Sequence, residues 1–254
     1  MPFAYWQDAH NNPKLPTFRN TGNPLVKDKF TADPAPLVHN GTLYLYVGHD
    51  EYYEGQTLPT AVRFNITNGS VTLRKTCRHG PNHGVVLKPT DFKWGIGEAW
   101  AAQVIEHNGK FYYYTTVQAG EPYNSKAIGV AVSDSPTGPF TDAIGKPLVT
   151  DDMTPNGPHG WWNDIDPTAL IDENGQAWLS WGNGTCFLAK LKPNLTEIDG
   201  DIEVVDLPRY VEGPWLHKRG DLYYLTYASF GQGRENISYA TAPNMEGPWT
   251  PQAN

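Results

Sequence analysis

The sequence contains only two cysteines, Cys77 and Cys186, among its 254 residues. Two cysteines are too few for a disulfide framework, and their spacing does not fit a metal site. The sequence also lacks any apolar run close to the roughly 20 residues of a membrane-spanning helix. No long segment repeats its apolar residues with the 3.6-residue period of an amphipathic helix, so we expect very little helix.

Positive charge is scarce as well. Lysine and arginine number 19 against 27 aspartates and glutamates, which gives a net charge of −8. An acidic chain disfavours nucleic acids and anionic membranes, and we expect neither as a partner. Residues 1–6 lack the basic region and the apolar core of a signal peptide. We expect a secreted, extracellular protein, with a cytoplasmic one as the alternative.

The abundant residues are those of short strands and tight turns: 25 glycines, 22 prolines and 13% aromatic residues. Within this background, an acidic residue stands just before a strand-like apolar run at four places. A single acid beside a proline is typical of a turn. Four acids at matching places in a repeat need a shared cause. The four are Asp33, Glu98, Asp166 and Glu212.

Each of these four segments continues into a short turn and then a second, aromatic strand. The turns are predicted at Asn40-Gly41, Asn108-Gly109, Asn174-Gly175 and Arg219-Gly220. Asn-Gly between two strand-like runs is the strongest short signal for a β-hairpin. A repeat of this length built only from strands predicts an all-β fold, in which each unit is one blade of a β-propeller. Residues 1–254 hold about four such units, which we expect to form a single domain.

Several short motifs occur in the order and spacing found in glycoside hydrolase family 43, and the chain resembles that family. The motifs are Ala-Asp-Pro at 32–34, Tyr-Val-Gly-His-Asp at 46–50, Glu-Ala-Trp-Ala at 98–101, Ser-Asp-Ser-Pro-Thr-Gly-Pro at 133–139, Asp-Ile-Asp-Pro at 164–167 and Glu-Gly-Pro-Trp at 212–215. The resemblance implies a five-bladed propeller with β-xylosidase, α-L-arabinofuranosidase or arabinanase activity. It implies Asp33 as the general base, Glu212 as the general acid and Asp166 as the modulator of the acid's pKa.

The chemistry of glycoside hydrolysis agrees with such a set of acids. A propeller gathers the starts of its inner strands around one central cavity, so the four acids should converge there. Hydrolysis needs one protonated carboxyl and one ionised carboxylate on opposite sides of the scissile bond. A third carboxylate nearby raises the pKa of the acid. By resemblance the enzyme inverts, which calls for about 6.5–9.5 Å between the two working carboxyls. The resemblance gives Glu98 no catalytic role, so a structural role is as well supported there.

Aromatic residues should complete the sugar site, because the apolar faces of a sugar stack on rings. Trp100 follows Glu98 closely, and by resemblance Trp100 and Phe230 line the subsite. His49 is a further candidate for substrate binding, with a structural role as the alternative. Trp161 and Trp162 fit either the rim of the site or plain packing. We expect no metal ligands and no required cofactor, although the resemblance allows a structural calcium ion in the central channel.

The end of the chain departs from the family pattern. A fifth blade should follow Trp249 and Thr250, and by resemblance it carries a histidine near the calcium and an arginine that reaches the sugar. Only residues 251–254 remain in this chain. An open ring of four blades exposes faces that are normally buried. We therefore expect a fragment, or an assembly that covers those faces.

Residues 68–81 are a second departure. The family has a pattern like W-x-x-Y-S-S-x-D-M-x-x-W-T here, whereas this chain reads NGSVTLRKTCRHGP. Codons exist for these residues that, preceded by G and read one base out of phase, spell EWLCYSSKDMSTWT. That string has the family pattern and the same length as the written segment. The residues on both sides of it fit the family without a shift of reading frame. Our hypothesis is a compensated frameshift, in the gene or in its recorded sequence.

The function that we predict from the sequence is an inverting glycosidase. It would remove α-L-arabinofuranosyl or β-D-xylosyl units from plant arabinoxylan, arabinan or oligosaccharides derived from them. Within the enzyme class, an endo-1,5-α-L-arabinanase is the alternative. Outside that class, the alternative is a carbohydrate-binding propeller that has lost catalysis.

Overall fold

The computed structural model describes residue 26 and residues 30–51, 65–74, 82–154 and 162–252. These residues form sixteen strands and two short 3₁₀ turns, η1 (Pro89–Asp91) and η2 (Asp151–Met153). Among them, no helix is long and apolar enough to cross a membrane. The strands form four antiparallel sheets of four strands each. The prediction of an all-β fold with about four blades is therefore confirmed.

Each sheet is one blade, and its strands follow one another in chain order from the inner strand outward. Blade 1 holds β1 (Phe30–His39), β2 (Thr42–Glu51), β3 (Asn65–Arg74) and β4 (Asn82–Leu87). Blade 2 holds β5 (Gly95–His107), β6 (Lys110–Ala119), β7 (Lys126–Ser133) and β8 (Thr141–Asp142). Blade 3 holds β9 (Thr168–Ile171), β10 (Ala177–Trp181), β11 (Cys186–Leu191) and β12 (Ile198–Val205). Blade 4 holds β13 (Tyr210–Arg219), β14 (Leu222–Gly231), β15 (Arg234–Ala242) and β16 (Thr250–Pro251).

The predicted hairpin turns lie between the first two strands of each blade. Asn40 and Gly41 have φ angles of 48° and 70°, and Asn108 and Gly109 have 52° and 75°. Two successive residues in the left-handed region make the turn whose twist matches that of the flanking strands, and Asn-Gly adopts it readily. The turn chemistry of the sequence therefore sets where the inner strands of blades 1 and 2 end.

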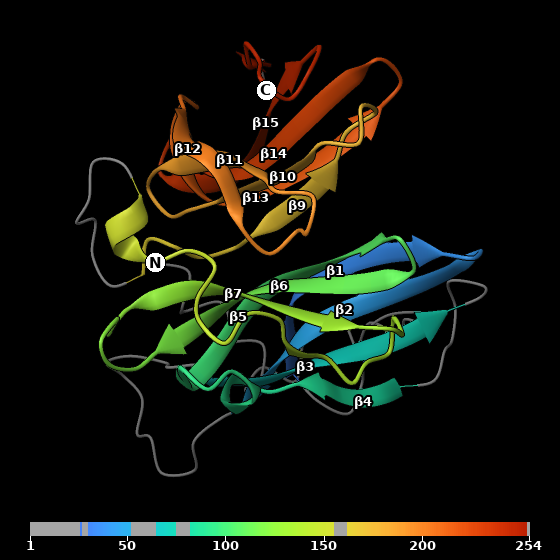
Figure 1. Cartoon of the computed structure of the whole chain (residues 1–254). Coiled ribbons are helices and arrows are strands. Elements are labelled where there is room, and N and C mark those ends of the chain that lie inside the picture. The colour runs from blue at the N-terminus through green and yellow to red at the C-terminus, as the bar shows by residue number, and fades with distance from the viewer. Residues whose placement is uncertain (1–25, 27–29, 52–64, 75–81, 155–161, 253–254) are drawn as a thin grey trace, which may run out of the picture.

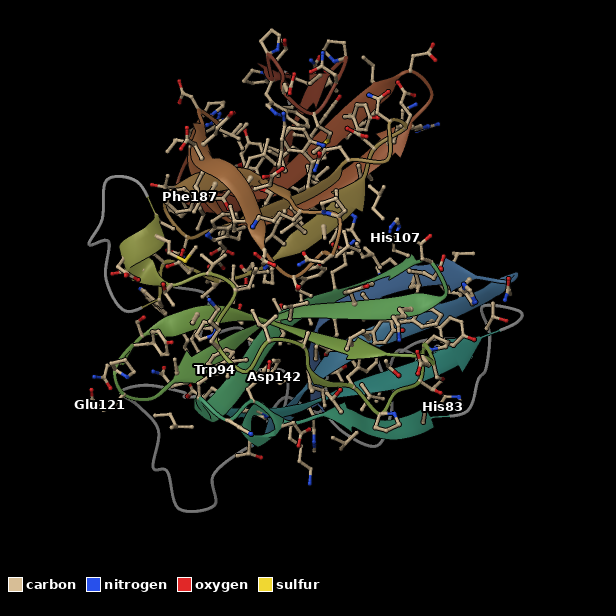
Figure 2. All side chains as sticks on the ribbon, viewed as in Figure 1. His83, Trp94, His107, Glu121, Asp142 and Phe187 are labelled. Carbon is tan, nitrogen blue, oxygen red and sulfur yellow. The ribbon has the colours of Figure 1, made fainter. Side chains whose placement is uncertain are left out.

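Apolar side chains fill the space between successive blades. One core cluster joins blades 1 and 2, a second joins blades 2 and 3, and a third joins blades 3 and 4. Figure 1 shows blades 1 and 2, in blue to green, below blades 3 and 4, in yellow to red. In Figure 2, Trp94 lies among the side chains of the lower pair and Phe187 among those of the upper pair. Both rings belong to these clusters, at 8% and 0% exposure.

Tyrosines on the second strands of blades 1 and 2 also tie each of these blades to the next. The hydroxyl of Tyr46 donates to the carbonyl of Pro136 at 2.7 Å. The hydroxyl of Tyr114 donates to the carbonyl of Leu195 at 2.8 Å. These hydroxyls find partners in the interfaces between blades, as buried polar groups must. The aromatic strands therefore supply both the apolar packing and the polar links that fix blade against blade.

The face of blade 4 that points away from blade 3 is open in the described chain. On it the ring of Tyr224 stacks with those of His217 and Tyr239, at 5.0 and 6.1 Å between centroids. Ile237 is 79% exposed on the neighbouring strand. The described residues place no fourth core cluster against this face.

Residues 75–81, the second half of the segment for which we infer a frameshift, lie outside the described residues. The first half belongs to β3, which pairs with β2 from Asn65 to Arg74 with one shift in register. Its pairing with β4 is interrupted twice by register shifts.

Candidate active site

Three of the four acids share an unusual backbone conformation. Asp33, Glu98 and Asp166 have φ angles of 51°, 47° and 60°. Residues other than glycine rarely adopt positive φ, and they do so mainly where the surrounding structure enforces it. Asp33 and Glu98 sit at interruptions of the strand register, and such bulges redirect a side chain. In these three blades the acid therefore recurs together with the same left-handed backbone conformation.

The fourth acid reaches the same end of its blade in a slightly different way. In blade 4 the register is interrupted between Glu212 and Trp215, and the residue with positive φ is Gly213, at 64°. The acid therefore stands one position before the left-handed residue, and glycine takes the conformation that aspartate or glutamate takes in the other blades. Glycine adopts it without the steric cost that a side chain adds.

Hydrogen bonds join the four segments in a row. The Asp33 carboxyl accepts a hydrogen bond from the backbone N–H of Ala101 on β5. The N–H of Asp166 donates to Thr116 Oγ1 of β6 at 3.0 Å, and Asp166 Oδ2 accepts from the N–H of Gly213 at 3.1 Å. Asp33, Asp166 and Glu212 are thereby brought together, as the repeat predicts.

Asp166 is the most perturbed of these acids. Burial raises its pKa to about 8, with the like charges of Glu212 and Asp33 as further causes, against the hydrogen bond from Gly213. A carboxylate pair in close contact resists losing its last proton. Asp166 therefore keeps its proton up to about pH 8.

Glu212 has the same direction of shift. Desolvation raises the pKa of Glu212, the charges of Glu235 and Asp33 add to it, and a hydrogen bond from Asn183 opposes it. The Asn183 amide Nδ2 lies 2.7 Å from Glu212 Oε2. Asp166 is not among the causes of this rise, whereas the charge of Glu212 does raise the pKa of Asp166, so the role of Asp166 as modulator of the pKa of Glu212 stays a prediction.

Asp33 lies at the more open side of the group, since its side chain is exposed. Desolvation by the neighbouring segments raises the pKa of Asp33, and the hydrogen bond from Ala101 opposes that rise. Asp33 is thus the acid among the three that water reaches most easily.

Glu98 forms an ion pair with Lys126. In this it differs from the other three acids, which interact with one another. The Lys126 ammonium also lies over the ring of Trp100, 3.5 Å from its centroid. The Trp100 ring meets that of Trp162 edge to face, with centroids 6.3 Å apart. Trp162 is 47% exposed, whereas Trp161 lies outside the described residues.

The two other predicted substrate-binding residues lie at the same ends of their blades as the acids. Phe230 is 54% exposed near the end of β14, and its N–H donates to the carbonyl of Arg209 at 3.0 Å. His49 is half-buried near the end of β2, opposite Thr31 in the register. Their positions suit a role in substrate binding, which stays a prediction.

Sequence reasoning missed two residues of this region, Asn183 and Lys126. Asn183 sits in the turn between β10 and β11, where Gly182 N–H donates to Ile165 O and Gly184 N–H donates to Val211 O. Glycines on both sides of an asparagine were the available signal, because they allow close approach of the backbone. Lys126 gave no signal, since a lysine at the start of a strand is usually solvated.

The described residues contain no group of three or more His, Cys, Asp and Glu side chains arranged to hold a metal ion. The structural calcium ion allowed by the resemblance stays an expectation. No step of the chemistry below depends on a metal.

Comparison with known proteins places this chain in a family. The model for glycosyl hydrolases family 43 matches residues 21–254. An arabinoxylan arabinofuranohydrolase of Bacillus subtilis is 30% identical, over 90% of this chain and 50% of the relative. An extracellular endo-α-(1→5)-L-arabinanase of the same organism is 27% identical, over 92% of this chain and 53% of the relative. The solved structure of an α-L-arabinofuranosidase from Clostridium thermocellum is 31% identical, with a TM-score of 0.71, over 90% of this chain and 74% of that one.

The chain spans about half the length of the curated arabinofuranohydrolases that it matches, at 50% and 42%.

Proposed function

Since the chain belongs to glycosyl hydrolase family 43, we propose that it is an inverting glycosidase with a single propeller domain. It removes α-L-arabinofuranosyl or β-D-xylosyl units from arabinoxylan, arabinan or their oligosaccharides. The names of its relatives support these substrates, and one of those relatives is extracellular. A plant cell-wall polysaccharide also calls for a secreted enzyme, which is the location we propose.

The observation that carries the proposal is the coupling of three carboxyls from three blades. The pKa of Asp166 is raised to about 8 and that of Glu212 is raised as well, mainly because both are desolvated. Glycoside hydrolysis at neutral pH needs such a carboxyl that keeps its proton. Acids that merely end strands would be solvated, and burial would not raise their pKa values.

In this mechanism Glu212 gives its proton to the oxygen of the leaving group as the glycosidic bond breaks. Asp33 takes a proton from water, whose oxygen attacks the anomeric carbon from the opposite face. Asp166 shares a proton with Glu212 before the reaction, and this keeps Glu212 protonated. The Gly213 N–H and Thr116 hold Asp166 in place for this exchange.

Trp100, Phe230 and His49 are the residues that we propose to contact the sugar. Trp100 and Phe230 place aromatic rings at the ends of the blades where the acids lie, and a sugar stacks its apolar face on such rings. His49, opposite Thr31, offers a hydrogen-bonding ring near Asp33.

An endo-acting arabinanase is the second candidate, because a curated relative with that name covers 92% of this chain. An exo-enzyme needs a closed pocket that admits one chain end, whereas an endo-enzyme needs an open groove. The two modes predict different products from the same polymer.

One set of assays tests the function. The purified protein is incubated with an aryl α-L-arabinofuranoside, an aryl β-D-xyloside, arabinoxylan and debranched arabinan. We expect release of free arabinose or xylose, with the inverted anomer formed first in the NMR spectrum. Long oligosaccharides from debranched arabinan would identify the endo-enzyme. Binding without turnover of any substrate would contradict the proposal and identify a carbohydrate-binding propeller.

A further inference from the structure

Glu98 has the local backbone of Asp33 and Asp166 but a different electrostatic partner. Its φ angle of 47° lies beside 51° and 60° for the other two, and it stands at the same place in the blade repeat. The repeat therefore delivers a fourth carboxylate to the end of the blades where the proposed catalytic acids gather. The proposed mechanism gives this carboxylate no role.

Lys126, the partner of Glu98, is a fully buried cation. Its side chain is 0% exposed, while that of Glu98 is 32% exposed. Desolvation lowers the pKa of Lys126, and the hydrogen bond to Glu98 opposes that change. A buried charge is expensive unless it is paired, so the two side chains hold each other in place.

The same ammonium group fixes an aromatic ring. Lys126 Nζ lies 3.5 Å from the centroid of Trp100, within the range of a cation–π interaction. Lys126 begins β7, two strands outward from β5, which carries both Glu98 and Trp100. One lysine thus holds a carboxylate and a ring that are two residues apart on the inner strand.

The Glu98 carboxylate has acceptor capacity left over. Its Oε2 receives the Lys126 ammonium, and in the described part of the chain no hydrogen bond to Oε1 is formed. An ionised carboxylate only accepts hydrogen bonds, through two oxygens with about four lone-pair sites. An oxygen that is partly open and lies beside a ring is placed to accept a hydrogen bond from a hydroxyl group of a sugar.

We propose that Glu98 is a substrate-binding residue that accepts a hydrogen bond from a hydroxyl of the pentosyl unit stacked on Trp100, and that Lys126 is the positioning residue of both. This inference rests on the proposed function for the class of ligand, since it takes a pentose as the sugar. Glu98 takes no part in proton transfer. Its effect falls on binding and on the choice among pentosyl units.

The test measures binding separately from catalysis. Affinity for arabino- and xylo-oligosaccharides is measured by calorimetry with the whole chain, for the parent protein and for Glu98→Gln. Glutamine keeps the shape but loses the charge. Because a hydrogen bond to a charged group is strong, we expect about 10- to 100-fold weaker binding, and a rise in KM with kcat little changed. The matched control is Glu246→Gln, which alters an exposed pair with Lys190 and should leave affinity unchanged.

Lys126 is tested by exchange of its charge and length. Lys126→Met removes the cation, whereas Lys126→Arg keeps it. We expect the methionine variant to lose affinity like Glu98→Gln, and the arginine variant to recover part of it. If the methionine variant does not fold, deoxy sugars still test the proposal on the parent protein. A ligand that lacks the contacted hydroxyl should bind the parent more weakly than the complete sugar does. The Glu98→Gln variant should bind the two ligands with equal affinity.

The outcomes separate this inference from the proposed function. Binding without hydrolysis would contradict the proposed function, and the Glu98→Gln comparison would still decide this inference. Hydrolysis by the parent with unchanged affinity and KM in Glu98→Gln would overturn the inference alone. Equal binding of every deoxy sugar by the parent would overturn it as well, and so would the absence of any pentose binding.

Discussion

Asn183 donates a hydrogen bond from its side-chain amide to Oε2 of Glu212, at 2.7 Å. The donor comes from the β10–β11 turn of blade 3, and the acceptor lies on the inner strand of blade 4. A donor at one carboxyl oxygen favours the ionised form and leaves Oε1 as the oxygen that can carry a proton. The bond therefore both aims the proposed acid and limits the rise of its pKa.

Replacement of Asn183 by alanine should raise the pKa of Glu212, because the opposing hydrogen bond is lost. We expect the basic limb of the rate–pH profile to move to higher pH. The maximal rate should fall by about 10-fold or more, since the acid is no longer aimed. Asn194→Ala is the matched control, as Asn194 donates to the exposed Glu197. A basic limb at the parental pH would contradict this account of Asn183.

Replacement of Asp166 by asparagine should move the basic limb the other way. In the parent, burial and the like charges of Glu212 and Asp33 raise the pKa of Asp166 to about 8. Without the second negative charge, Glu212 loses its proton at lower pH, so activity should decline at lower pH. The measurement is kcat/KM against pH for an aryl glycoside. An unmoved basic limb would remove Asp166 from its role as modulator.

The same substitution has a predicted effect on stability. The folded-state pKa of Asp166 is about 8, against an ordinary value of 3.8. Stability that depends on the protonated form is fully present below pH 4 and is lost as the pH rises to 8. Asparagine has no charge to bury, so Asp166→Asn should be more stable than the parent at pH 8. At about 1.4 kcal/mol per pKa unit, we expect a gain of at least about 2 kcal/mol.

Urea unfolding at pH 4, 6 and 8 checks this difference. The gain should be near zero at pH 4 and should grow with pH. Asp134→Asn serves as the control, because Asp134 is an exposed partner of Lys110 and its loss should give no such trend. A gain in stability that is constant across pH would contradict this account. It would indicate that the substitution acts through packing and that burial does not raise the pKa of Asp166.

The sequence predicted the parts of this molecule that repeat. The turns at Asn40 and Asn108 follow from local backbone preference, and the acids Asp33 and Asp166 stand at the same place in each unit, so both could be read from spacing. Lys126 and Asn183 could not. Each acts through a partner that is distant in the chain or lies in another blade, and only packing brings the pairs together. A lysine with a charge to bury looks in the sequence like any exposed lysine.

The hypothesis of a compensated frameshift predicts particular tryptic peptides from protein purified from its source. The written sequence gives FNITNGSVTLR for residues 64–74. The shifted reading gives FNITEWLCYSSK, followed by DMSTWTNHGVVLK. If the error lies in the recorded sequence, mass spectrometry should detect the two peptides of the shifted reading and should not detect FNITNGSVTLR. Detection of FNITNGSVTLR would show that the written residues are the real ones.

The proposed acid and base can be separated by the leaving group of the substrate. Glu212→Ala removes proton donation to the leaving oxygen, so its cost should shrink for dinitrophenyl glycosides, which need little protonation. On xylan or arabinoxylan the loss should be at least about 10²–10⁴-fold, the usual contribution of general acid–base catalysis. Asp33→Ala removes the activation of water, and its loss should persist for every leaving group.

Azide tests the face from which Asp33 acts. In Asp33→Ala, a small anion can enter the vacated space and attack the anomeric carbon without a base. The product should then be a glycosyl azide of inverted configuration, because attack comes from the side opposite the leaving group. Rescue by azide in Glu212→Ala, with retained configuration, would instead require a covalent intermediate and a nucleophile in place of a base. Equal losses of Glu212→Ala on good and poor leaving groups would likewise end the assignment of Glu212 as the acid. Neither result would touch the propeller, whose blades are set by the hairpins and the cores between them, so the experiment bears on the chemistry alone.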